Sequence, residues 1–72
     1  MTAKEMFEAL GYKKSIYDDP FPHIEWYASG LGTIEFNLST KTFCTYERME
    51  ALDIDMQTFK AIKKQLEELR WI

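Results

Sequence analysis

The chain contains few of the residues that build disulfides, metal centres and membrane spans. Its 72 residues include one cysteine and one histidine, and no apolar run approaches the roughly 18 residues of a membrane-spanning helix. The single Cys44 excludes an intrachain disulfide, so the core alone has to stabilise the fold. Glu5 and Glu8 interrupt the region where a signal peptide needs an unbroken apolar stretch. We therefore expect a cytoplasmic protein with no membrane association.

An excess of positive charge is also missing. The 12 acidic residues outnumber the 9 basic ones, and the net charge is −3. A protein that binds nucleic acid through its phosphates usually carries a dominant basic field. Lys60, Lys63 and Lys64 nevertheless line one predicted helix, and charge can segregate by face. A nucleic-acid-associated protein that uses this lysine face is therefore the alternative function.

The spacing of histidine, cysteine and acidic residues along the sequence matches no metal-binding or catalytic motif. His23 and Cys44 fall on the first and third predicted strands, so the middle strand separates them by roughly 9–10 Å. That distance argues against a Cys–His nucleophile pair, and the spacing predicts no metal and no cofactor site. The paired carboxylates lie in predicted loops, at a cap or on a solvated helix face, away from the partly dry cleft that acid–base catalysis needs. We expect no enzymatic activity.

Aromatic residues are abundant: the chain has 5 Phe, 4 Tyr and 2 Trp. A chain of this size buries only about 60% of the surface that its unfolded form exposes, which leaves little room for a deep pocket. Large rings bury much area per residue, so they are an efficient way to build so small a core. The composition predicts one domain over residues 1–72, with modest stability.

The first helix is predicted over residues 2–10. Thr2 and Glu5 have the spacing of a capping box, and Gly11 suits the left-handed residue that ends a helix. The last helix is predicted from Met56 onward, with Asp55 as its N-cap. It carries an apolar stripe with helical spacing, centred on Phe59, Ile62, Leu66 and Leu69.

Between these helices the period changes from helical to alternating. Residues 23–28, 33–38 and 42–47 read as three antiparallel strands, with a hairpin loop at 29–32. We expect a connector at 12–22 with room for one short edge strand, and a loop or irregular turn at 48–52. The fold class is then α+β, a three-stranded antiparallel β-meander with an N-terminal and a C-terminal helix packed on one face. The predicted core is Met6, Phe7, Leu10, Ile24, Trp26, Ile34, Phe36, Leu38, Phe43, Phe59, Ile62, Leu66 and Leu69.

Several segments of the chain resemble segments found in a known group of proteins. They are Ala3-Lys4-Glu5-Met6-Phe7 with Leu10-Gly11-Tyr12, then Ile34-Glu35-Phe36 and Lys41-Thr42-Phe43, and finally Ala61-Ile62-Lys63-Lys64-Gln65-Leu66-Glu67-Glu68-Leu69-Arg70-Trp71. In these the chain resembles a family of small proteins from phages and prophages of low-GC Gram-positive bacteria. The resemblance implies a phage or prophage origin, and it implies no particular activity. Lys63 stands where the family has Asn. Arg70 replaces the family's Gly, so the last helix is free to run on to the final residues.

Candidate contacts with a partner are apolar side chains outside the predicted core. If the last helix continues, Trp71 lies roughly 160° from its apolar stripe and forms, with Ile72, an exposed hot spot. Helix ends often fray, which favours the alternative that Trp71 folds back onto the sheet or the first helix. Phe21, between two prolines, has the same two alternatives, and we expect it to be buried.

Tyr27 and Tyr46 lie on the predicted outer face of the sheet. Neighbouring carboxylates there would repel phosphates, so a protein partner or simple cross-strand packing is favoured over stacked bases. The sequence names no specific activity. We therefore predict a small, non-enzymatic protein-interaction module of phage or prophage type, whose ligand is another protein or a second copy of the chain.

Overall fold

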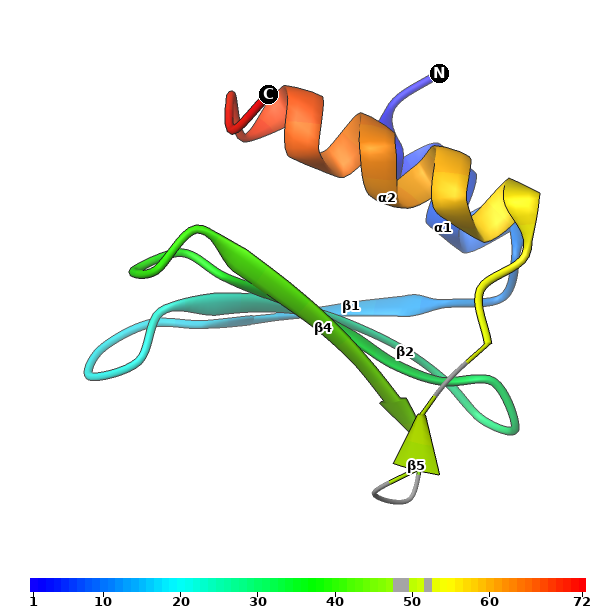
Figure 1. Ribbon diagram of the computed structural model, residues 1–72, viewed down its shortest axis with the longest axis horizontal. Coiled ribbons are helices and arrows are strands. Elements are labelled where there is room, and N and C mark those ends of the chain that lie inside the picture. Colours follow the sequence, from blue (N-terminus) through cyan, green and yellow to red (C-terminus); the bar gives the residue numbers. More distant parts are fainter. Residues whose placement is uncertain (48–49, 52) are drawn as a thin grey trace.

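The computed structural model describes residues 1–47, 50–51 and 53–72 and contains one antiparallel sheet with two helices. The elements, in order, are α1 (Ala3–Ala9), β1 (Lys13–Tyr17), β2 (His23–Ala28), β3 (Gly32–Asn37), β4 (Thr42–Glu47), β5 (Glu50–Ala51) and α2 (Met56–Glu68). Each strand pairs antiparallel with the next, in the order β1-β2-β3-β4-β5. Both helices lie on one side of the sheet (Figure 1). The α+β class and the placement of the helices on one face are confirmed.

The sheet is larger than the three strands predicted. In the described part of the chain it has four full strands and the two-residue β5. β1 lies within residues 12–22 and is the short edge strand for which the sequence left room. All five of its residues are exposed, so it has no buried face and therefore no strong hydrophobic alternation to reveal it. β5 lies within the loop expected at 48–52, of which residues 48, 49 and 52 are outside the described ranges.

The ends of α1 follow the sequence closely. The backbone N–H of Glu5 donates to Thr2 Oγ1 at 3.1 Å, and the N–H of Thr2 donates to Glu5 Oε1 at 2.8 Å, which confirms the capping box. Gly11 has φ +97°, a left-handed conformation that costs glycine little. The N–H of Tyr12 then donates to the carbonyl of Phe7 at 3.0 Å, and the two rings pack edge to face at 5.6 Å. Tyr12 is thereby buried and leads the chain into β1.

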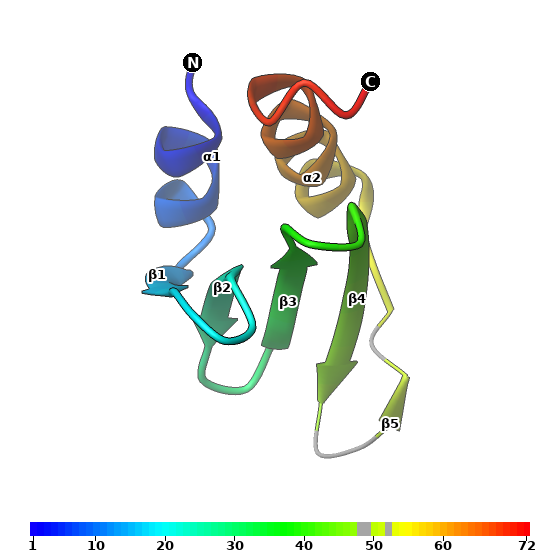
Figure 2. The same cartoon turned by 90° about the vertical axis from the view of Figure 1, so that its left-hand side faces the viewer.

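α2 begins as predicted and ends differently. Asp55 Oδ1 accepts from the N–H of Thr58 at 2.7 Å, which confirms the N-cap. At the other end Arg70 adopts φ +61°, and the N–H of Trp71 donates to the carbonyl of Leu66 at 3.0 Å. This is the helix-ending turn that glycine usually supplies, here made by arginine. α2 therefore does not run on to the final residues. The chain turns after the helix (Figure 2), which confirms the favoured alternative that Trp71 folds back.

The core lies between the helices and the inner face of the sheet. Trp26 stacks on Phe7 with ring centroids 4.6 Å apart, and its Nε1–H donates to Gln65 Oε1 at 3.1 Å. Phe36 packs against Phe7 from the neighbouring strand, at 6.4 Å. The buried apolar residues are Ala3, Phe7, Tyr12, Ile24, Trp26, Ala28, Ile34, Phe36, Ala61 and Ile62. The predicted core residues Met6, Leu10, Leu38, Leu66 and Leu69 are partly buried against them.

Phe43 and Phe59 are corrections to the predicted core, because both are about half exposed. Phe43 lies on β4 and packs against Phe36 of the core, with ring centroids 5.8 Å apart. Phe59 is exposed because α2 buries a different face from the predicted stripe. Its buried residues are Thr58, Ala61, Ile62 and Gln65, and at about 100° per residue their centre is roughly 70° from that of the stripe. α2 also packs against α1.

Candidate functional site

The face of the sheet that points away from the helices, here called the outer face, carries most of the polar chemistry of the strands. Register pairs place its residues in three rows across β1 to β4. The rows are Tyr17, His23, Asn37 and Thr42; Ser15, Glu25, Glu35 and Cys44; and Lys13, Tyr27, Thr33 and Tyr46. Neither described helix covers this face (Figure 1). It therefore presents side chains from four strands on one surface.

Three tyrosines mark the first and third rows of the outer face. Tyr17, Tyr27 and Tyr46 are 47%, 51% and 38% exposed. The sequence pointed to Tyr27 and Tyr46, and the structure places both on this face, on either side of the buried Thr33. Tyr17 was missed because β1 was expected to be a connector. Its alternation with Lys13 and Ser15 is the only signal that could have found it.

His23 lies in the first row, next to the carboxylates of the middle row, and its ring is held in a defined orientation. Its ring stacks on Tyr17, with centroids 4.4 Å apart and an interplanar angle of 13°. Nδ1 lies 2.8 Å from the carbonyl oxygen of Phe21. Because a carbonyl only accepts hydrogen bonds, Nδ1 carries the proton. Nε2 then points toward two carboxylates, 3.5 Å from Glu35 Oε1 and 3.9 Å from Glu25 Oε2.

Glu25 and Glu35 are direct cross-strand partners on β2 and β3. Like charges directly opposite each other on a sheet are destabilising, so this pair calls for a positive charge nearby. One oxygen of each carboxylate and one nitrogen of His23 all lie within 4.8 Å of one another, and the three residues are half-buried. We call this group the His23–Glu25–Glu35 cluster. Sequence reasoning missed it because it weighed His23 only against Cys44.

Cys44 and Tyr46 border the cluster on β4. The Cys44 thiol donates to Glu35 Oε2 at 3.8 Å. Partial burial and the Glu35 carboxylate raise the pKa of Cys44, and burial with the carboxylates of Glu25 and Glu35 raises the pKa of Tyr46. Both groups are therefore held in their neutral forms. β3 lies between His23 and Cys44 as expected, and Glu35 contacts both.

The predicted contact residues at the C-terminus and in the β1–β2 loop have different surroundings. Trp71 folds back and is partly buried near Phe36, at a centroid distance of 6.4 Å, so it is no exposed hot spot. Ile72 is exposed beside it. Phe21 is 75% exposed, which corrects the expected burial. The loop that carries Phe21 projects past the end of the sheet (Figure 1), beyond the reach of the core.

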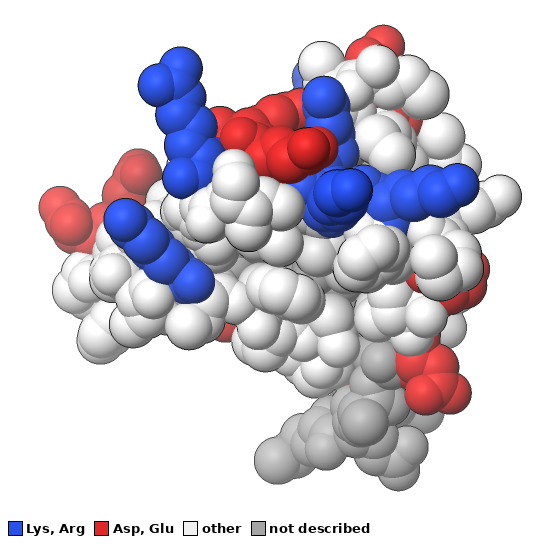
Figure 3. All heavy atoms as spheres, turned by 45° about the horizontal axis from the view of Figure 1, so that its top comes forward, with Lys and Arg blue, Asp and Glu red and all other residues white. Residues whose placement is uncertain are grey.

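The surface around the lysines of α2 carries both positive and negative charges. Lys60 and Lys63 are exposed and Lys64 is half-buried. On the helix side of the molecule, blue basic groups surround a patch of red acidic ones (Figure 3). Glu68 of the same helix accepts a hydrogen bond from the N–H of Ala3 at 2.7 Å, which ties a carboxylate to this side. Mixed charge lowers the local attraction for phosphates.

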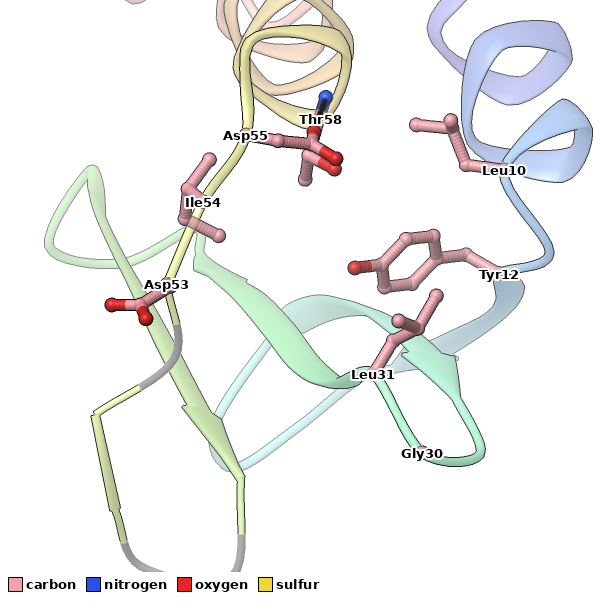
Figure 4. A pocket seen from close by; sticks show the side chains of 8 residues that line it. All are labelled: Leu10, Tyr12, Gly30, Leu31, Asp53, Ile54, Asp55 and Thr58. Atoms are coloured by element: carbon pink, nitrogen blue, oxygen red, sulfur yellow. Dashed lines mark hydrogen bonds between the residues drawn. The ribbon is translucent and has the colours of Figure 1, made fainter.

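A cavity of about 460 Å³ opens where the start of α2 meets α1 and the sheet. Its lining residues are Leu10, Tyr12, Gly30, Leu31, Asp53, Ile54, Asp55 and Thr58. The Tyr12 hydroxyl points into the cavity (Figure 4), and burial raises its pKa, so it stays protonated. Asp55 is engaged as the helix cap.

Comparison with known proteins identified no relative of this chain. No model of a protein family matches the chain, and neither the curated proteins nor the solved structures contain a significant match. The resemblance to phage and prophage proteins therefore stays a prediction. Neither helix in the described ranges combines the length and the apolar character that a membrane span requires.

Proposed function

We propose that the protein is a small, non-enzymatic interaction module that binds a protein partner through the outer face of its sheet. The observation that carries the proposal is the set of three exposed tyrosines, Tyr17, Tyr27 and Tyr46, on a sheet face that no described helix covers. A cytoplasmic location and a phage or prophage context complete the proposal, and both rest on the sequence alone.

The physical argument concerns contact area and entropy. A tyrosine offers a large, amphipathic contact surface and loses only two side-chain torsions on binding. Tyr27 and Tyr46 lie two strand spacings apart, about 9–10 Å, on a rigid ladder. The fold has therefore already ordered the contact groups, which lowers the entropy cost of association.

The charge of the outer face narrows the class of partner. Glu25 and Glu35 lie between the tyrosine rows, and a phosphate backbone would meet their carboxylates. A protein surface with lysine or arginine opposite these carboxylates gains electrostatic complementarity instead. Tyrosine is enriched in such interfaces. A basic or neutral protein epitope fits the face better than nucleic acid does.

The test is affinity capture with a face-specific variant. Tagged protein and its Tyr27→Thr/Tyr46→Thr variant are incubated with a Gram-positive host lysate, with and without nuclease, and captured proteins are quantified by mass spectrometry. We expect a near-stoichiometric protein that survives nuclease and is lost in the variant. Phe59→Thr is the matched control, because Phe59 is a similarly exposed aromatic residue on the opposite, helix side.

Two results would contradict the proposal. Capture that disappears with nuclease and with Lys60→Glu/Lys63→Glu/Lys64→Glu moves the function to the lysine face of α2. Capture lost in Phe59→Thr and retained in the tyrosine variant moves it to the helix side. Sedimentation of the isolated chain identifies a second copy as the partner if the tyrosine variant alone abolishes self-association.

A further inference from the structure

We propose that the His23–Glu25–Glu35 cluster binds one divalent transition-metal ion of the zinc type. This goes beyond the proposed interaction function and does not depend on it. The cluster contributes one imidazole nitrogen and two carboxylates, and one atom from each lies within 4.8 Å of the other two. Nitrogen and oxygen ligands bind zinc at about 2.0–2.2 Å, so tetrahedral ligand atoms are about 3.3–3.6 Å apart. The 3.5 Å and 3.9 Å distances from His23 Nε2 are close to that spacing.

The imidazole is oriented as metal-binding histidines usually are. Its Nδ1–H donates to the Phe21 carbonyl at 2.8 Å, which leaves Nε2 as the ligand atom facing the carboxylates. A hydrogen bond from the second nitrogen to a carbonyl fixes the ring and raises its basicity as a ligand. Stacking on Tyr17 at 4.4 Å restrains the same ring from one side. The ligand geometry is thus largely set before an ion binds.

The charges of the cluster favour the binding of a divalent cation. His23 Nε2 lies 3.9 Å from Glu25 Oε2 and 3.5 Å from Glu35 Oε1, and the two carboxylates are direct cross-strand partners of like charge. A divalent ion between the three groups supplies two positive charges and bonds to all of them. Imidazole suits zinc, copper, iron and nickel, while magnesium and calcium prefer all-oxygen sites. The mixed ligand set therefore selects the zinc-type ions.

The site keeps free coordination positions. Three protein ligands leave at least a fourth position, on the exposed side of the sheet. Cys44 is adjacent, since its Sγ lies 3.8 Å from Glu35 Oε2, but it is not one of the three ligands. A water molecule, or a side chain of a protein bound to the outer face, fits the open position.

The test is calorimetric titration of the full chain, free of any histidine tag, with zinc ions, followed by cobalt(II) as a spectroscopic probe. We expect one zinc per chain. His23→Gln and Glu35→Gln each remove a ligand, and we expect each to weaken binding at least tenfold. Glu8→Gln, the same charge change on an exposed residue of α1, serves as the matched control and leaves affinity unchanged. Far-UV circular dichroism verifies that each variant is folded.

Cys44→Ser separates the site from simple thiol binding. We expect it to retain zinc, and we expect the cobalt spectrum of the unmodified chain to lack a thiolate charge-transfer band. Zinc binding lost only in Cys44→Ser, or equal in His23→Gln and the unmodified chain, would overturn the proposal. So would the absence of any one-to-one binding. Affinity capture of the protein partner is repeated in the presence of a metal chelator. This measurement tests the proposed interaction function separately from the proposed metal site.

Discussion

The two faces of the sheet are built from alternate residues of the same strands, yet they have opposite properties. Trp26 is fully buried, and its neighbour Tyr27 is 51% exposed. The inner face packs aromatic and aliphatic side chains against two helices, whereas the outer face presents tyrosines and carboxylates. Single-residue alternation thus lets a chain of 72 residues use one side of its sheet for stability and leave the other free for binding.

The largest expected effect comes from Trp26→Ala. It removes a fully buried indole that stacks on Phe7, so the free energy of unfolding should fall by about 3–5 kcal/mol. Tyr27→Ala, one residue along the same strand, should cost about 1 kcal/mol or less. Equilibrium urea unfolding measures both values. Equal losses in the two variants would contradict the division between the faces.

A smaller effect is expected from Gln65→Leu. Gln65 is buried, and its side-chain carbonyl accepts the only hydrogen bond recorded for the indole N–H of Trp26 in the described structure. Leaving that donor unpaired should cost about 1–3 kcal/mol of stability. Glu67→Leu, on the exposed side of α2, should change stability by about 0.5 kcal/mol or less. Thermal unfolding of the two variants decides whether the polar contact contributes to the inner face.

Arg70→Gly should stabilise the protein. Arg70 holds φ +61°, which costs a non-glycine residue about 1 kcal/mol, and glycine adopts this conformation without strain. We therefore expect a gain of up to about 1 kcal/mol, since the more flexible unfolded chain offsets part of it. Glu67→Gly, within α2, should lose a similar amount. A destabilised Arg70→Gly would show that the arginine side chain has a role at the end of the helix.

The smallest effect concerns reactivity on the outer face. The Glu35 carboxylate contributes to the raised pKa of Cys44, so Glu35→Gln should lower that pKa. More thiolate is then present near pH 8, and alkylation by iodoacetamide should accelerate by a few-fold. Glu47→Gln, also on β4, is the control and should leave the rate unchanged. An unchanged rate in Glu35→Gln would show that the carboxylate does not act on the thiol.

Elements with strong local patterns could be read from the sequence. The capping box at Thr2, the N-cap at Asp55 and the alternation of β2 and β3 were all found in the structure. The sequence left room for β1 as an edge strand without fixing its bounds, because its five residues are all exposed and no buried face marks them. β5 falls within an expected loop and is defined by its pairing with β4. The exposure of Phe59 depends on how α2 is rotated against α1, which is a tertiary property.

For the candidate sites too, local patterns could be read from the sequence, whereas contacts between strands could not. Exposure of Tyr27 and Tyr46 followed from alternation within single strands. The His23–Glu25–Glu35 cluster depends on the register between β2 and β3, which places Glu35 opposite Glu25. His23 and Glu25, two residues apart on one strand, were the only local signal. Trp71 folds back because of the turn at Arg70, a conformation that favours glycine and that the residue type did not reveal.

Equilibrium urea unfolding of the Tyr17→Thr/Tyr27→Thr/Tyr46→Thr variant tests the central claim most directly. If the outer face is free of a structural role, the variant should unfold cooperatively, with a free energy within about 1.5 kcal/mol of the unmodified chain. A loss near the 3–5 kcal/mol expected for Trp26→Ala would contradict the account, because the outer face would then be part of what stabilises the fold.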